Sequence, residues 1–92
     1  YSAAKAGINA LTFVWSKELS RFNIRVAGIS PGFFSTDSTH KSLNKSYIKH
    51  LKETTPSKRL GNQSELISGI DFIIKNKFFN GKILEIDGGL KI

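Results

Sequence analysis

The sequence predicts an α/β fold with parallel strands, and three patterns carry this prediction. Apolar residues recur with a helical period from Ser2 to about Arg21. Two short runs rich in β-branched residues, Ile24 to Ile29 and Lys82 to Ile86, are typical of strands. A second helical pattern lies between them and supplies the crossover that parallel strands need. The expected order is helix, strand, polar segment, helix, strand, with both strands in one right-handed βαβ unit.

The first helix is predicted from a stripe of apolar residues at a period of 3.6. The stripe consists of Ala4, Ile8, Leu11, Trp15 and Leu19. The polar residues of the segment lie largely off it: Asn9, Ser16, Lys17 and Glu18. Because Phe13 and Val14 widen the apolar surface, we expect this helix to pack in two directions. We expect Asn23 to end it.

The polar segment runs from Phe33 to about Pro56, after Ser30-Pro31-Gly32 has stopped the first strand. A short helix is expected around Leu43 to Leu51. The lysines at this end are expected on one solvated face of that helix: Lys41, Lys45, Lys49 and Lys52.

The second long helix is expected to be capped by Asn62 or Ser64. Its apolar face consists of Leu66, Ile67, Ile70, Ile73 and Ile74. Asn80-Gly81 then breaks the chain before the closing strand, and that strand ends at Asp87-Gly88-Gly89.

Composition places the chain among globular proteins, with 39% hydrophobic and 23% charged residues. No apolar run approaches the ~18 residues that would span a bilayer, so we expect a cytoplasmic protein without a membrane partner. The absence of cysteine excludes disulfides and cysteine metal sites. His40 and His50 lack further ligands at suitable spacing, so no metal site is predicted.

The net charge of +7 first suggests an anionic partner. The lysines of the chain are dispersed along the sequence. They are not accompanied by the arginine clusters and interleaved aromatic residues that bind phosphates and bases. We therefore do not expect a nucleic-acid partner, while an acidic carrier protein stays open.

Two parallel strands do not form a sheet that stands alone, because parallel sheets are normally covered by helices on both faces. The chain also begins on Tyr1 and contains no methionine. We therefore expect residues 1–92 to be a part of a larger domain, with residues missing before Tyr1.

Four motifs in order resemble those of the short-chain dehydrogenases and reductases. Tyr1-Ser2-Ala3-Ala4-Lys5 resembles the YxxxK signature, and Pro31 to Thr36 resembles the PGxxxT loop. Arg59-Leu60-Gly61 with Glu65 resembles the RxG turn and acidic helix start, and Ile86 to Gly89 resembles the closing strand and DGG turn. The resemblance covers the whole chain.

The resemblance implies the C-terminal portion of a Rossmann-like, doubly wound parallel sheet. Residues 1–92 would then be the C-terminal part of a single NAD(P)-binding domain. Its cofactor-binding half, with the glycine-rich phosphate loop and the catalytic Ser and Asn, would lie upstream of Tyr1. The chain departs from the family at Ala27, where many members have Asn, and in the short link from Lys75 to Asn80; both bear on subfamily.

The resemblance also implies that Tyr1 and Lys5 are catalytic. Residues four apart on a helix share a face. A ketone that accepts hydride from a nicotinamide needs a proton from a positioned acid, and a nearby cation stabilises a phenolate. Tyr1 is the implied proton donor, and Lys5 is the implied cation that tunes it. In the family this lysine also contacts the nicotinamide ribose, so both residues are implied to bind NAD or NADP.

Pro31-Gly32 ends its strand at the carboxyl end, where open α/β sheets bind ligands. The resemblance implies cofactor contacts at Pro31, Gly32, Phe34 and Thr36. The segment from Asp37 to Pro56 corresponds to the substrate-covering loop of the family. Its neighbourhood offers residues that either contact a substrate or pack within the loop: Phe33, Phe34, Leu43, Tyr47 and Leu51.

The leading hypothesis is an NAD(P)-dependent oxidoreductase that interconverts a carbonyl and a secondary alcohol. A 3-oxoacyl-thioester reductase is slightly favoured, because Lys17 and Arg21 could receive an acidic acyl carrier protein. A sugar-derivative or small-alcohol dehydrogenase and a non-catalytic binding or scaffold member are the alternatives. The first helix is implied to pair with its copy through Phe13, Val14 and Trp15 in a homodimer or homotetramer. The chain alone is expected to be inactive.

Overall fold

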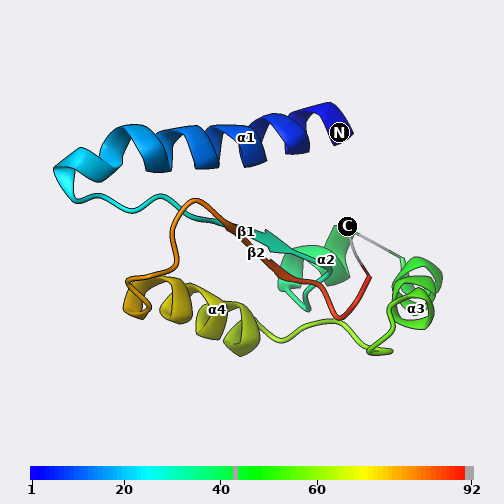
Figure 1. The fold of residues 1–92 in the computed structure, drawn as a ribbon. Coiled ribbons are helices and arrows are strands. Elements are labelled where there is room, and N and C mark those ends of the chain that lie inside the picture. Colours follow the sequence, from blue (N-terminus) through cyan, green and yellow to red (C-terminus); the bar gives the residue numbers. More distant parts are fainter. Residues whose placement is uncertain (43, 91–92) are drawn as a thin grey trace.

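A computed structural model describes residues 1–42 and 44–90. Its elements follow the predicted order, with additions in the polar segment. They are α1 (Ser2–Leu19), a 3₁₀ turn (Ser20–Phe22), β1 (Gly28–Pro31), α2 (Asp37–Ser42), α3 (Lys45–Thr54), α4 (Gln63–Lys75) and β2 (Ile83–Ile86). Figure 1 shows β1 and β2 side by side between α1 and α4. These parts form the three layers of an α/β fold.

The two strands pair in parallel, with Gly28 opposite Ile83 and Pro31 opposite Ile86. Parallel pairing was predicted, but the bounds of the first strand, Ile24 to Ile29, were wrong. β1 begins four residues later and includes Pro31, because only these residues lie opposite β2. The preceding segment bonds instead to the loop before β2. The N–H of Val26 donates to Asn80 Oδ1 (2.9 Å), and its carbonyl accepts from the N–H of Gly81 (2.7 Å).

Arg25 connects the segment before β1 to the end of α4 through hydrogen bonds. Its Nη1 donates to the carbonyls of Ile73 (2.8 Å) and Phe79 (3.0 Å), and its Nη2 donates to the carbonyl of Ile74 (3.0 Å). The last carbonyls of a helix have no partner within it and carry partial negative charge. The planar guanidinium therefore satisfies several of them at once.

The face of α1 that packs on the sheet differs from the predicted one. Thr12 and Ser16 are buried, whereas Ile8, Leu11 and Trp15 of the predicted stripe are 63%, 41% and 47% exposed. The buried face meets glycine backbone, since a Cβ added to Gly81 would lie 2.6 Å from Ser16 Oγ. Small hydroxyl side chains fit this close approach, and they satisfy their polar atoms on α1 carbonyls.

The end of α1 agrees with the sequence prediction. Asn23 follows the 3₁₀ turn in the left-handed conformation, with φ 61°. Its N–H donates to the carbonyl of Ser20 (2.9 Å), which closes the turn.

Helix α4 begins after Asn62, as predicted, and packs on the other side of the sheet. Gly69 is buried there, and a Cβ at this position would collide with the terminal methyl of Ile86. The outer face of α4 carries exposed Ile67 and Ile74. The start of α4 after Asn62 confirms the capping prediction. The apolar residues of α4 are only partly buried.

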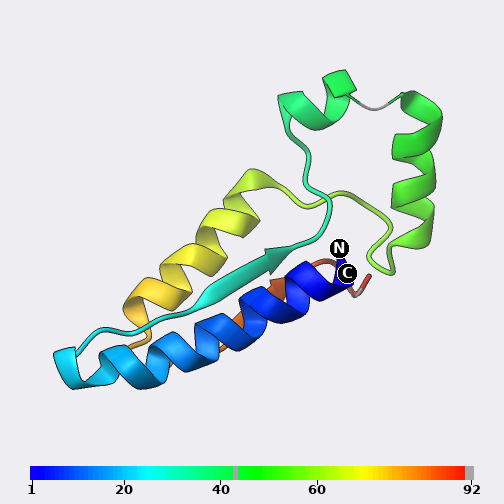
Figure 2. The ribbon, with the colours of Figure 1, turned by 90° about the horizontal axis from the view of Figure 1, so that it is seen from above.

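The helix predicted around Leu43 to Leu51 is present as α3, and a second short helix, α2, precedes it. Asn44 Oδ1 accepts the N–H of Tyr47 (2.7 Å), which starts α3 at Lys45. Leu43 lies outside the described residues. Lys41 belongs to α2 and the other three lysines to α3, so the predicted single lysine face is wrong. Figure 2 shows both helices standing beyond the end of the sheet.

Little apolar surface is buried in the part of the chain that the structure describes. Its hydrophobic cluster comprises Ile48 and Leu51 of α3 together with Leu60. The radius of gyration is 15.4 Å, against about 12 Å for a compact domain of this length. Broad apolar faces of α1 and α4 are thus uncovered.

No helix among the described residues is long and apolar enough to cross a membrane.

Replacing Arg25 tests its role at the end of α4. We predict that Arg25→Ala lowers the free energy of unfolding by about 1 to 2 kcal/mol, because carbonyls at the end of α4, some of them partly buried, lose a charged donor. Arg25→Lys recovers only part of this, since an ammonium lacks the guanidinium fork. Urea unfolding followed by Trp15 fluorescence measures the effect. The control is Lys77→Ala, at an exposed position of the same loop; equal stabilities of the two alanine variants would contradict the assignment.

Candidate active site

The first turn of α1 holds the predicted catalytic pair. Tyr1 occupies the position before the helix, and its carbonyl accepts the N–H of Lys5 (2.9 Å). This bond closes the first turn and fixes the one-turn spacing of the two residues. The Tyr1 side chain is 83% exposed and Lys5 is partly buried. In Figures 1 and 2, this end of α1 lies near the end of the sheet at which both strands finish.

Tyr1 and Lys5 line an open groove between α1 and β1. Its other lining residues are Ala4, Ile8, Asn9, Gly28, Ile29, Ser30, Pro31 and Ile83. The groove therefore joins the predicted pair to Pro31, the first residue of the predicted cofactor loop. Asn9 and Ser30 add polar groups that the sequence did not single out.

The loop after β1 is attached to β2 at its first residue. The N–H of Gly32 donates to the carbonyl of Ile86 (2.8 Å). A Cβ on Gly32 would lie 2.7 Å from the Cα of Asp87. Any side chain would push the two strand ends apart, so glycine is required here for this close approach.

The loop is attached a second time at Phe33 and Ser35, which both bond to the backbone of Gly61. The N–H of Gly61 donates to the carbonyl of Phe33 (2.9 Å), and its own carbonyl accepts the N–H of Ser35 (2.8 Å). This is a parallel bridge between Phe34 and Gly61. Because peptide groups alternate along extended backbone, the N–H and carbonyl of Phe34 point away from Gly61.

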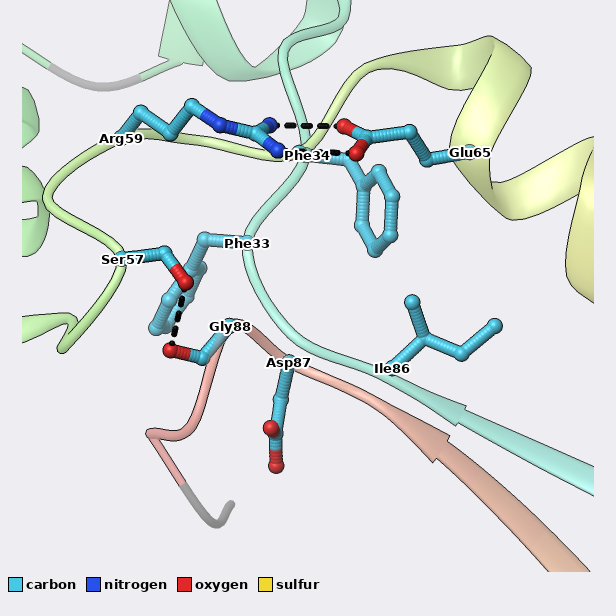
Figure 3. Close-up of a pocket in the computed structure, with 9 residues that line it drawn as sticks. Phe33, Phe34, Ser57, Arg59, Glu65, Ile86, Asp87 and Gly88 are labelled. Carbon is cyan, nitrogen blue, oxygen red and sulfur yellow. Dashed lines mark hydrogen bonds and ion pairs between the residues drawn. The ribbon is translucent and has the colours of Figure 1, made fainter.

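Behind the loop lies a second pocket, drawn in Figure 3. It is lined by Phe33, Phe34, Ser57, Arg59, Gly61, Glu65, Ile86, Asp87 and Gly88. Ser57 Oγ donates to the carbonyl of Gly88 (3.0 Å), which joins the segment before Arg59 to the turn after β2. Phe33, a predicted substrate contact, lies in this pocket and not in the Tyr1 groove.

Arg59 and Glu65 form a bidentate ion pair at the edge of this pocket (Figure 3), with Nη1 to Oε1 at 2.7 Å and Nη2 to Oε2 at 2.8 Å. Glu65 Oε1 also accepts the N–H of Asn62 (2.9 Å). The Arg59 hydrogen bonds, and secondly the Asn62 N–H, lower the pKa of the Glu65 carboxyl to about 2. The same pair raises the pKa of Arg59 above its ordinary value.

Tyr47 and Thr36, which were also predicted as site residues, do not line the groove. Tyr47 lies on α3, half exposed, and lines neither the Tyr1 groove nor the second pocket. Leu43 is outside the described residues. Thr36 is partly buried directly before α2, where its carbonyl accepts the N–H of His40 (3.1 Å).

The ion pair of Arg59 with Glu65 is the feature that sequence reasoning did not place in a site. Glu65 stands three residues after Asn62, which is the spacing of a capping box and could have indicated a fixed carboxylate. Within residues 1–42 and 44–90, no group of three or more His, Asp or Glu side chains could hold a metal ion.

Comparisons with known structures agree with this fold. A 4-hydroxyisoleucine dehydrogenase complexed with NADH has a TM-score of 0.85 at 31% identity, covering 99% of this chain and 39% of that one. A small-chain dehydrogenase in complex with NADPH has a TM-score of 0.83 at 32% identity, covering 96% and 41%. The fold and the groove at the strand ends thus define the Rossmann-like class of α/β dehydrogenases and reductases. The predicted fold class is confirmed.

Sequence comparison gives the family. The family described as enoyl-(acyl carrier protein) reductase matches residues 1–91. The human 3-oxoacyl-[acyl-carrier-protein] reductase is 36% identical over 92 residues, and the 5-keto-D-gluconate 5-reductase of Escherichia coli K12 is 36% identical over 95. The chain belongs to the short-chain dehydrogenase/reductase family. It spans 37% of the length of each of these two relatives.

The lowered pKa of Glu65 predicts how its contribution to stability varies with pH. Its folded value of about 2 lies below the ordinary 4.5, so the fold favours the ionised carboxylate. We predict that the stability difference between the wild type and Glu65→Gln is constant above about pH 5 and shrinks as the pH falls towards 2. Chemical unfolding at a series of pH values measures it.

A second variant tests whether the ion pair with Arg59 is the cause of the lowered pKa of Glu65. Arg59→Gln removes the largest contribution to the shift, so the Glu65 titration followed by NMR should move up towards the ordinary carboxyl range. A Glu65 titration that stays near 2 in Arg59→Gln would contradict the assignment.

Proposed function

We propose that the intact protein carrying this chain is an NAD(P)-dependent oxidoreductase that interconverts a carbonyl and a secondary alcohol. The observation that carries the proposal is the groove in which Tyr1 and Lys5 stand together with Pro31, at the carboxyl end of β1. Open α/β sheets bind their ligands at this end. Residues 1–92 would be the C-terminal part of a single NAD(P)-binding domain and, without the phosphate-binding half, inactive alone.

The residues at the strand ends suit a nicotinamide nucleotide. Lys5 offers ammonium donors to ribose hydroxyls, and the Thr36 hydroxyl and the main chain of Phe34 offer groups suited to a carboxamide and phosphates. Gly32 lets the loop lie close to Asp87 where it leaves the sheet. Solved relatives of the chain contain NADH or NADPH. When bound, such a cofactor supplies the hydride.

Two residues of the chain supply the proton and stabilise the phenolate that is left when the proton has been donated. The Tyr1 hydroxyl donates a proton to the carbonyl oxygen as negative charge develops on it, and takes the proton back in the oxidation direction. The ammonium of Lys5, one turn along α1, stabilises the phenolate that Tyr1 becomes. The helical turn closed by the Lys5 N–H keeps both groups on one face.

For the substrate we favour a 3-oxoacyl thioester carried by an acyl carrier protein. Lys17 and Arg21 are exposed near the end of α1 and are suited to an acidic partner. The equal identity to a 5-keto-D-gluconate reductase supports a second candidate, an oxidised sugar acid. Rates with a 3-oxoacyl thioester and with 5-keto-D-gluconate, compared at equal cofactor, separate the two.

We also propose a homodimer or homotetramer. Phe13, Val14 and Trp15 are each at least two-fifths exposed on α1. Apolar surface of this kind marks protein contacts, and a second copy of α1 would cover it. Analytical ultracentrifugation of the intact protein tests this.

Removing the phenol hydroxyl tests the proposed proton donor. We predict that Tyr1→Phe in the intact protein lowers kcat for carbonyl reduction by about 100-fold or more, because the developing alkoxide loses its acid. Binding of the reduced cofactor, followed by nicotinamide fluorescence, should change far less. Unchanged reduction by Tyr1→Phe would contradict the assignment.

Removing the cation tests Lys5. We predict that Lys5→Met lowers kcat and also raises KM for the cofactor, because the residue both stabilises the phenolate and contacts the ribose. Steady-state kinetics with varied NADH or NADPH separates these effects. Lys77→Met, at an exposed lysine remote from the groove, is the control and should match the wild type; a Lys5 variant that also matches it would contradict the role.

A further inference from the structure

Glu65 is held in place by the helix that carries it. It lies in the first turn of α4, and α4 is seated on the sheet at Gly69, which touches the side chain of Ile86. The Glu65 N–H donates to the carbonyl of Asn62 (2.9 Å), which completes the helix start. The carboxylate is therefore attached to the rigid part of the fold.

From this position Glu65 fixes the turn before α4. Its carboxylate accepts from both terminal nitrogens of Arg59 and from the N–H of Asn62. Arg59 and Asn62 flank Leu60 and Gly61, so both ends of this short turn are tied to one carboxylate. Arg59 Nη1 also donates to the carbonyl of Leu60 (3.2 Å), within the turn. Bidentate pairs of this kind fix geometry as well as adding energy.

Gly61, inside that turn, holds the loop after β1. Its N–H and carbonyl bond to Phe33 and Ser35, the residues on either side of Phe34. The Phe34 ring is buried against Gly61, since a Cβ there would lie 2.5 Å from Phe34 Cε2. In Figure 3 the Phe34 ring lies beside the ion pair. The loop is thus attached at Gly32 by β2 and at Ser35 by the turn.

We infer that Arg59 and Glu65 are positioning residues for cofactor binding. Their ion pair fixes Gly61, and Gly61 fixes the main chain from Phe33 to Ser35 and the start of the segment that leads to Thr36. The inference rests on the proposed function, which places cofactor contacts at Phe34 and Thr36. Without the pair, the turn that carries Gly61 would lose its side-chain connection to α4, and the loop would be held at Gly61 by a less firmly placed backbone.

A merely structural role for the pair predicts a different result. An ion pair that only stabilises the fold lowers the temperature of unfolding and leaves the cofactor affinity of the folded protein unchanged. A second exposed ion pair, Lys75 with Asp71 at 3.0 Å, joins two residues within α4 and lies outside the turn from Arg59 to Asn62. Asp71→Ala is therefore a matched control.

The test measures binding of NADH and of NADPH to the intact protein by nicotinamide fluorescence. It uses the wild type, Arg59→Ala, Glu65→Ala, the double variant and Asp71→Ala. We expect the Kd of the preferred nucleotide to rise about tenfold in either single variant, because small displacements of a positioned contact are costly. The double variant should lose no more than either single variant, since both residues act through one turn. Asp71→Ala should bind like the wild type.

Steady-state kinetics gives the second readout. KM for the nucleotide should rise while kcat at saturating nucleotide changes much less, and Glu65→Gln, which keeps an acceptor for Asn62, should be intermediate. Glu65→Gln and Arg59→Lys replace the alanine variants if those do not fold. Lowered thermal stability with unchanged nucleotide Kd would overturn the inference. A wild type that binds neither nucleotide would remove the proposed function itself, and this inference with it.

Discussion

The parallel pairing of β1 with β2 is the constraint on which the rest of the structure depends. It sets Pro31 opposite Ile86, so the loop after β1 and the turn after β2 leave the sheet at the same edge. Gly32 permits this, because its missing side chain lets the Asp87 main chain approach. α1 and α4 cover opposite faces, and the start of α1 lies at the same edge (Figure 1). The groove and the second pocket both form there.

The sequence predicts the elements well and their packing less well. Helical periodicity locates α1 and α4, and Asn23 and Asn62 mark where one ends and the other begins, because these signals are local. The buried face of α1 is different, since Thr12 and Ser16 are buried against glycine backbone that comes from distant parts of the chain. Apolar Ile8 and Trp15 mark a face that the described residues cover only in part. A hydrophobic pattern indicates which face of a helix is apolar, but it does not indicate which segment of the chain packs against that face.

The same distinction applies to the site. Tyr1 and Lys5 share a groove because of spacing within one turn, and Pro31 joins them through its place at the end of a strand; both could be predicted. The function of Arg59 and Glu65 depends on the bridge between Phe34 and Gly61, which joins segments far apart in the chain. Tyr47 was expected near a substrate because of its loop, yet it lies on α3 and lines neither the groove nor the pocket.

Deuterium transfer tests the proposed chemistry most directly. The intact protein is given a 3-oxoacyl thioester, or 5-keto-D-gluconate, with NADH or NADPH deuterated at both C4 positions, and the alcohol is examined by mass spectrometry. Hydride transfer with Tyr1 as proton donor predicts one deuterium on the former carbonyl carbon of each alcohol molecule, and a strongly reduced rate of formation of this labelled alcohol with Tyr1→Phe. Alcohol formed without the label, or labelled alcohol formed by Tyr1→Phe at the rate of the wild type, would contradict the proposal.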